Sequence, residues 1–374
     1  MSNLKVLILG GRQCGKTSLL ASIFDSMMHG KTNEFLIACD KTILEERQHS
    51  LLWKRLNLEH FIDKGNSSTF CVKYIPDNCC WNYILELRIP GTDKRMNVQF
   101  LDVPGYILKV GSHHLSDIAS RVNEFNVFIV VVDTPYLMAD CKAVAESANV
   151  IDSIHTILMQ IDSQNGRYVK QVLFVPVKCE KWVKNGKIDD VTRKIEEIYS
   201  ATIQYLMASS NNGISIIPVE TAGDIIFSEF KEPYVLINTH TNSYISCAKI
   251  SDRLVLLPDG KVHRIAEDEI LSADPCAVFD SGNGVSRNIR MNEWFHLRNE
   301  PKAVYSPRNC EQLLLHIIRY EYFKATLRFP WLRKNGNNVF FGNILINDIA
   351  DVLGRLSQAN MIKDRGEGIK VLKT

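Results

Sequence analysis

The first 220 residues alternate between short apolar runs and longer amphipathic stretches. Nearly continuous apolar runs stand at 6–9, 125–133 and 172–177, a pattern typical of parallel strands that are buried on both faces of a sheet. After the first run, apolar residues recur at the spacing of one helix face: Leu19, Leu20, Ile23, Phe24 and Met27. This alternation predicts an α/β fold, a three-layer sandwich around a mostly parallel central sheet.

Other segments predict further helices and strands of the same fold. Helical spacing runs over 40–62 and over 139–160, and the last apolar run of this part is the strand 214–219. Strands at 70–75, 83–89 and 97–101 are also expected, and the last two pair through a turn at 90–93.

The character of the chain changes after residue 223. Short β-prone runs at 234–238, 244–250, 254–257 and 262–265 are separated by turn residues, among them the hairpin signal Pro258-Asp259-Gly260. A helix is expected at 310–327, then a helix at 343–360 and a strand at 369–372. We therefore divide the chain into a core over 1–223, a β-rich insertion over 224–309, the last core helix over 310–328 and a small C-terminal α/β appendage over 329–374.

The composition indicates a globular protein and also bears on the compartment in which it is found. The 374 residues are 45% hydrophobic and 23% charged with a net charge of +2, so a sizeable core is expected and no global charge argues for a polyanionic partner. Ten cysteines have neither a CxxC pair nor histidine partners at zinc-ligand spacing. No secretory signal and no apolar run of about 18 residues is found. These features predict a protein of the reducing cytoplasm with no membrane span.

The strongest chemical signal lies between the first strand and the first helix. The segment GGRQCGKT, residues 10–17, is a complete GxxxxGK[ST] pattern. Glycines allow such a loop to turn its backbone N–H groups toward phosphates, and the helix N-terminus adds positive potential. The lysine would reach the β and γ phosphates, and the threonine hydroxyl would hold Mg²⁺. Candidate nucleotide contacts are Gly10, Gly11, Arg12, Gln13, Cys14, Gly15, Lys16, Thr17 and Ser18.

A second carboxylate follows the strand 96–101. Asp102-Val103-Pro104-Gly105 is a DxxG element, in which Asp102 would bind magnesium through water and the Gly105 N–H would meet the γ-phosphate. Tyr106 follows, where a Ras-like or translation-factor GTPase carries a water-positioning Gln or His. The neighbouring His113 and His114 could substitute or be merely solvated. Slow turnover, or turnover completed by a partner, is expected.

A hydroxyl from the segment between the two phosphate motifs would complete the magnesium site. Thr69 is the first candidate and Ser68 the second, and both could instead be ordinary loop hydroxyls. The predicted metal ligands are thus Thr17, Asp102 and Thr69. The predicted catalytic residues are Lys16, Thr17, Asp102, Gly105 and Thr69.

Two loops occupy the places where GTPases read the guanine base. The run 172–177 ends in Val177-Lys178-Cys179-Glu180, which departs twice from [NT]-K-x-D; the Glu180 carboxylate can still accept two hydrogen bonds, and the Lys178 stem would lie over the base. Thr221-Ala222, after the strand 214–219, matches Ser-Ala of the second loop. Four nucleotide elements in the expected order support one another.

Residues 4–223 therefore resemble the TRAFAC clade of P-loop GTPases. More narrowly, the chain looks like bacterial GTPase-like proteins of multi-gene conflict or defence-type systems, some of which carry paired GTPase domains. The resemblance rests on the phosphate loop and five further segments: 102–105, 132–138, 176–181, 221–223 and 306–312. It implies the P-loop fold, Mg²⁺ and GTP or GDP as ligands.

The leading hypothesis is a magnesium-dependent guanine-nucleotide switch that hydrolyses GTP slowly and signals to a protein partner, which could be an effector, an activator or an operon-encoded component. Arg12 could supply charge to the phosphates or be solvated. The alternatives are a nucleotide-bound interaction module without turnover and an ATP-using P-loop enzyme. The basic and aromatic segment Arg319–Lys334 could bind nucleic acid, but the favoured interpretation is a helix with an aromatic core face and a solvated basic face.

Overall fold

The computed structural model of the chain describes the following residues: 3–28, 36–38, 70–71, 80–88, 95–108, 113–139, 142–161, 170–208, 212–231, 234–241, 243–257, 261–272, 292–297, 305–318, 340–341, 344–345 and 365–373. The predicted helix 40–62, the turns 90–93 and 258–260, the candidates Ser68 and Thr69, and the segment Arg319–Lys334 lie outside the described residues.

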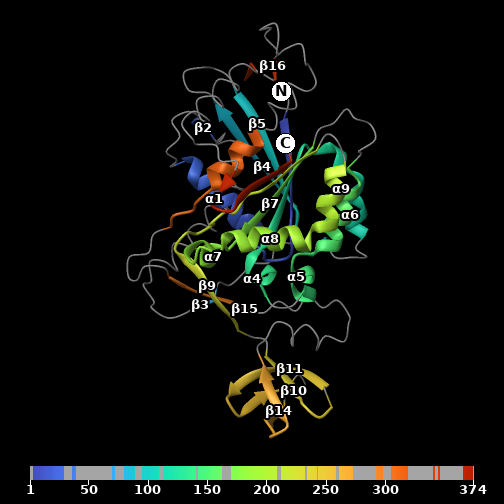
Figure 1. Cartoon of the computed structure of the whole chain (residues 1–374), viewed down its shortest axis with the longest axis vertical. Coiled ribbons are helices and arrows are strands. Elements are labelled where there is room, and N and C mark those ends of the chain that lie inside the picture. Colours follow the sequence, from blue (N-terminus) through green and yellow to red (C-terminus); the bar gives the residue numbers. More distant parts are fainter. Residues whose placement is uncertain are drawn as a thin grey trace.

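A nine-stranded sheet forms the centre of the molecule (Figure 1). Five neighbouring strands run parallel: β8 (Asn212–Ile216), β7 (Lys170–Val177), β6 (Val127–Asp133), β1 (Asn3–Leu9) and β5 (Arg95–Asp102). Antiparallel strands extend both edges. Beyond β5 come β4 (Trp81–Arg88) and β2 (Leu36–Ala38), and beyond β8 come β19 (Ile369–Lys373) and β18 (Arg365–Gly366).

Helices cover both faces of this sheet. On one face, α1 (Lys16–Met28) and the helix 310–318 share an apolar core with Val6 and Ile8 of β1. The alternate residues Leu7 and Leu9 point into a second core with helices of the other face. The helices of that face and its end are α3 (His113–Ser120), η1 (Val122–Glu124), α4 (Thr134–Leu137), α5 (Lys142–Ala148), α6 (Ile151–Met159), α7 (Glu180–Lys184), α8 (Ile188–Ile198) and α9 (Ser200–Ala208). The predicted three-layer α/β sandwich is confirmed.

The predicted helix 139–160 is divided into α5 and α6. Val150 has a left-handed φ of 47°, and the Asn149 side chain accepts a hydrogen bond from the Asp133 backbone N–H at 2.7 Å. A left-handed residue cannot continue a right-handed helix. The helix therefore breaks where Asn149 turns toward the end of β6.

The predicted β-rich insertion contributes to two smaller sheets. In one, β15 (Asn292–Leu297) pairs with β9 (Ile225–Lys231) and with β3 (Phe70–Cys71), which contains the start of the strand predicted at 70–75. The other stands apart from the sandwich in Figure 1 and has the order β13 (Val262–Arg264), β12 (Leu254–Leu256), β11 (Ser243–Ser251), β10 (Tyr234–Asn238) and β14 (Glu269–Ser272). Strands β12 and β13 pair across the predicted hairpin.

The C-terminal strands need a different assignment from the one expected. The strand predicted at 369–372 is present as β19, but it pairs with β8 and so extends the central sheet instead of belonging to a separate appendage. The first residues of the predicted helix 343–360 include β17 (Ile344–Leu345), which pairs with β16 (Phe340–Phe341), so this helix does not begin where expected. Residues 346–364 lie outside the described part.

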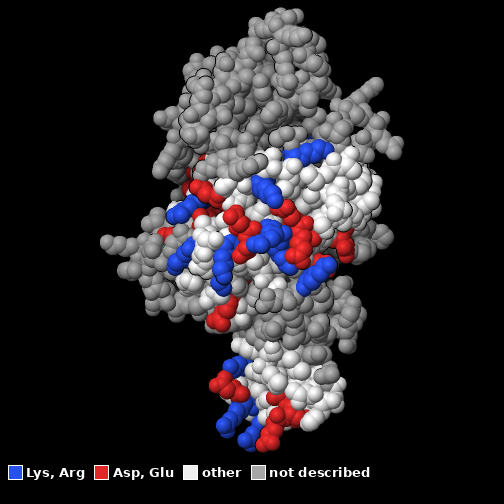
Figure 2. Space-filling model, in the orientation of Figure 1, with Lys and Arg blue, Asp and Glu red and all other residues white. Residues whose placement is uncertain are grey.

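Charges of both signs are mixed on the face shown in Figure 2, over α7 and α8. On α8, for example, Lys194 pairs with Glu197 at 3.0 Å, and Lys370 of β19 reaches Glu196 at 2.6 Å. The described residues of this face therefore show no single-sign patch that would attract a polyanion. Among the described helices, none has the length and apolar character required to cross a membrane.

Candidate functional site

The loop between β1 and α1 is shaped for close approach to a ligand. Gln13 and Gly15 have positive φ values of 60° and 105°, and a Cβ on Gly10 would stand 2.8 Å from both the Cys14 Sγ and the Val131 carbonyl oxygen. Lys16 is 7% exposed, and its Nζ donates to the carbonyl oxygens of Gly10 and Gly11, each at 2.9 Å. The lysine ammonium is thus held over the loop on which phosphates are expected.

Asp102 meets the same loop from the neighbouring strand. It ends β5 opposite Ile8 of β1, is 4% exposed, and its Oδ2 accepts a hydrogen bond from the Thr17 hydroxyl at 3.1 Å. A hydroxyl and a carboxylate oxygen at one point are the hard oxygen donors that Mg²⁺ prefers. The two residues therefore fit a magnesium ion.

Gly105 lies directly against the phosphate loop. A Cβ built there would be 2.5 Å from the Arg12 Cα and still closer to the Arg12 nitrogen and the Gly11 carbonyl carbon. No side chain larger than hydrogen fits, so the backbone of 102–105 and the phosphate loop touch. Tyr106 follows on the surface with 37% exposure, and Arg12 is also exposed.

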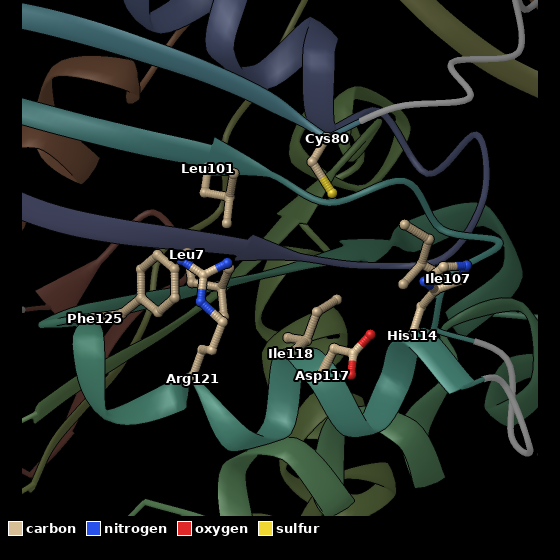
Figure 3. Close-up of a pocket in the computed structure, with 9 residues that line it drawn as sticks. All are labelled: Leu7, Cys80, Leu101, Ile107, His114, Asp117, Ile118, Arg121 and Phe125. Carbon is tan, nitrogen blue, oxygen red and sulfur yellow. The ribbon is translucent and has the colours of Figure 1, made fainter.

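A pocket opens beside the segment that follows Gly105 (Figure 3). Its volume is about 170 Å³, and it lies between β1, β5 and α3. The lining residues are Leu7, Cys80, Leu101, Ile107, His114, Asp117, Ile118, Arg121 and Phe125. His114 is thus an exposed residue at the wall of this pocket. Because Ile107 forms part of the wall, any movement of the 105–108 segment would change the shape of this surface.

The candidate base reader begins at the end of β7. Lys178 has a φ of 56°, in the left-handed region, and its Nζ donates to the Gln13 carbonyl oxygen and to Asp133 Oδ2, both at 3.1 Å. The Lys178 Cε also lies 3.9 Å from a Cβ position on Gly15. Unusual backbone conformations of this kind concentrate at functional sites. The contacts with Gln13 and Gly15 show that the lysine stem runs beside the phosphate loop.

Glu180 contacts the 221–222 loop. Glu180 is 2% exposed at the start of α7, and its Oε1 accepts from the Ala222 backbone N–H at 3.3 Å. Burial, together with the nearby Glu220 charge, raises the pKa of Glu180 to about 7, although hydrogen bonds from backbone N–H groups oppose this shift. The Ser22 hydroxyl of α1 donates to the Thr221 carbonyl oxygen at 2.8 Å. The base loops are thus attached to the helix of the phosphate loop.

The structure brings most of the sequence-predicted residues together where the parallel strands of the central sheet end, which we call the candidate nucleotide edge. The phosphate loop, Asp102, Gly105, Lys178, Glu180 and the 221–222 loop are linked by the contacts above, whereas Thr69 lies outside the described residues. Two further carboxylates at this edge were not predicted as site residues: Asp133 and Glu293, which both contact Lys178. Asp133 could have been found from its position after a central parallel strand; Glu293 follows no such pattern.

A family model described as Double-GTPase 2 matches residues 5–224 of this chain. The chain belongs to the Double-GTPase 2 family. The match covers every candidate nucleotide motif from the phosphate loop to Thr221-Ala222, so membership in a GTPase family supports GTP binding at this site.

Among solved structures, this Double-GTPase 2 family member is similar to the GTPase-like domain of Ski7 from S. cerevisiae, bound to GTP. The identity is 10%, the alignment covers 79% of this chain and 75% of that chain, and the TM-score is 0.31. The family assignment is independent of that remote similarity. No curated protein matches the sequence.

Proposed function

We propose that this chain is a guanine-nucleotide switch that binds GTP with Mg²⁺, hydrolyses it slowly to GDP and phosphate, and signals its nucleotide state to a protein partner. The observation that carries the proposal is the hydrogen bond between the Thr17 hydroxyl and Asp102, which joins the phosphate loop to the second phosphate motif. The proposed compartment is the reducing cytoplasm, in keeping with the free thiols of the buried Cys179 and Cys310.

The roles of the residues follow from their positions. The loop N–H groups and the Lys16 ammonium bind the phosphates, and the Gly105 N–H contacts the γ-phosphate. Thr17 and Asp102, together with the Thr69 hydroxyl, would hold Mg²⁺, which neutralises charge on the phosphates when bound. Catalysis of this kind requires positioning and electrostatic stabilisation, with no covalent bond to the protein.

Tyr106 makes the expected rate low. A phenol at 37% exposure cannot position the attacking water as the carboxamide of Gln does, so hydrolysis depends on the phosphate contacts alone, on a neighbouring group such as His114, or on a group from a partner. The same residue favours the second candidate function, a nucleotide-bound interaction module without turnover. The pocket beside Ile107 is the surface at which a partner would read the nucleotide state.

The nucleotide that the purified protein carries tests the proposal most directly. We expect GDP or GTP after denaturation and ion-exchange chromatography, and single-turnover conversion of added GTP to GDP over minutes to hours in Mg²⁺. Bound GTP that stays intact over that time would support the interaction module instead. A fluorescent GTP analogue that ATP displaces as well as GTP does would indicate an ATP-using enzyme.

The pKa of Glu180 gives a pH dependence with a definite sign. Guanine donates two N–H groups to the carboxylate, so the form that reads the base is the ionised one, present above the pKa of about 7. The ionised fraction rises from about a tenth at pH 6 to about nine tenths at pH 8. We therefore expect the affinity for GDP to rise about tenfold over this range, measured with a fluorescent GDP analogue.

The control for this titration is Glu180→Gln, which keeps the shape and removes the ionisable group. The nucleotide phosphates titrate equally in both proteins, so the difference between the two pH profiles isolates Glu180. Identical profiles would mean that Glu180 does not contact the base. A GTP-over-ATP preference that survives Glu180→Ala would contradict the assignment in the same way.

A further inference from the structure

The ammonium group of Lys178 is held by three acceptors from three different parts of the chain. Its Nζ contacts the Gln13 carbonyl oxygen at 3.1 Å, Asp133 Oδ2 at 3.1 Å and Glu293 Oε2. An ammonium carries three N–H donors, one for each of these acceptors. The side chain of Lys178 is only 9% exposed, so these contacts fix the head group out of bulk water.

The third acceptor comes from outside the residues that match the family. Glu293 lies on β15, beyond the five-stranded sheet and well past residue 224, and it is 1% exposed. In register, Glu293 stands opposite Phe230 of β9, the strand that leaves the 221–223 loop. The candidate nucleotide edge thus receives a buried carboxylate from a distant segment.

Aromatic packing fixes the position of β15. Phe295, two residues from Glu293 on the same strand, is 4% exposed and meets the Phe227 ring edge-on with centroids 6.1 Å apart. Both rings share an apolar cluster with Ala222 and Ile225. Trp182 of α7 stacks on Phe227 at 6.2 Å. Strand β15 is therefore anchored to the two loops proposed to surround the base.

Strand β15 also pairs with β3, which begins one residue after the candidate magnesium ligand Thr69 in the sequence. On its other edge it pairs with β3, with Phe295 opposite Phe70 and Trp294 opposite Cys71. Residue 70 directly follows Thr69 in the sequence. One strand thus joins the segment after Thr69 to the lysine of the base loop.

The charges around Lys178 indicate what Glu293 does there. A buried lysine ammonium needs a counterion, and Asp133 alone supplies one. Glu293 adds a second carboxylate to the same ammonium, and a carboxylate repels phosphates. A second carboxylate is therefore better suited to orienting the lysine at the base end than to binding phosphates.

We propose that Glu293 is a positioning residue of the nucleotide site: it fixes the Lys178 head group so that the lysine stem lies over the base, and the nucleotide-binding unit therefore extends to β15. This inference rests on the proposed function. It means that residues 5–224 alone lack one of the groups that hold the base reader in place.

The test is the variant Glu293→Gln in the full chain. It keeps the shape of the side chain and removes its charge, and we expect GTP and GDP to bind about tenfold more weakly and the preference for GTP over ATP to fall. Glu293→Asp should recover part of both. The matched control is Glu229→Gln, an exposed glutamate on the neighbouring strand β9, which should leave both quantities unchanged. In a Lys178→Ala background, Glu293→Gln should change the affinity less than twofold, because the group it positions is gone.

Several outcomes would overturn the inference. A Glu293→Gln protein that melts at a lower temperature but keeps the affinity and the GTP preference of the wild type has lost only a structural contact. Should the variant not fold, hydrogen exchange on the wild type decides: GDP must slow exchange of the amides of 292–297, and unchanged rates refute the proposal. If the wild type itself binds neither GTP nor GDP, the proposed function fails; if it binds both and only the Glu293 results are negative, the function stands without this inference.

Discussion

Replacing Lys16 with alanine should weaken the binding of GTP about 1,000-fold and the binding of GDP, which lacks the γ-phosphate, about 30-fold. The ammonium would donate charge-assisted hydrogen bonds to two phosphates, each worth about 2 kcal/mol, and about 4 kcal/mol corresponds to three orders of magnitude in Kd. The side chain is buried and donates to the Gly10 and Gly11 carbonyl oxygens, so its ammonium is already positioned over the loop. Fluorescence titrations with a labelled non-hydrolysable GTP analogue and with a labelled GDP measure the two losses.

The control is Lys187→Ala, an exposed lysine at the start of α8. It removes the same charge from the protein without touching the loop, and we expect Kd to change less than twofold. An equal loss in both variants would point to a general charge effect. Wild-type affinity in Lys16→Ala would show that the loop does not bind phosphates and would remove the basis of the proposed function.

The architecture was predictable because each core element has a local signal. The apolar run 125–133 is stable only as a strand that is covered on both faces of a sheet, and β6 is indeed buried at every position. The hairpin β4–β5 follows from two alternating strands around a turn. The helix break at Val150 was not predictable, since it depends on the Asn149 side chain reaching the Asp133 backbone across the end of the sheet. The pairing of β19 with β8 likewise joins segments far apart in sequence.

In the candidate site too, some residues were predictable from the sequence and others were not. Motifs with fixed spacing located Lys16, Thr17, Asp102 and Gly105, because phosphates demand particular residues at particular intervals. The burial that raises the pKa of Glu180 arises from tertiary packing, so the sequence predicted the carboxylate but not its protonation. Glu293 has no motif around it and reaches Lys178 only because aromatic packing anchors β15.

Gly105→Ala should remove most of the preference for GTP over GDP. A methyl group at this position would overlap the backbone of Gly11 and Arg12, so the segment 102–108 must move away from the phosphate loop. The Gly105 N–H then loses the hydrogen bond that we propose it makes to the γ-phosphate, which would be worth roughly 10- to 100-fold in affinity for GTP. GDP, which has no γ-phosphate, should bind nearly as in the wild type, and GTP hydrolysis should fall with the same contact.

The overlap also costs stability, because an added methyl group in a tight contact typically costs about 1–3 kcal/mol. Gly213→Ala on β8 is the matched control: its new Cβ would meet the Gln171 Cγ at 3.7 Å and the Lys373 carbonyl oxygen at 3.8 Å, ordinary contact distances, so both nucleotide affinities should stay unchanged. Calorimetric titration with GDP and with a non-hydrolysable GTP analogue measures the ratio. A Gly105→Ala protein that loses GDP and GTP affinity equally would mean that the methyl group deforms the phosphate loop itself, and that the contact between the two motifs does not sense the γ-phosphate.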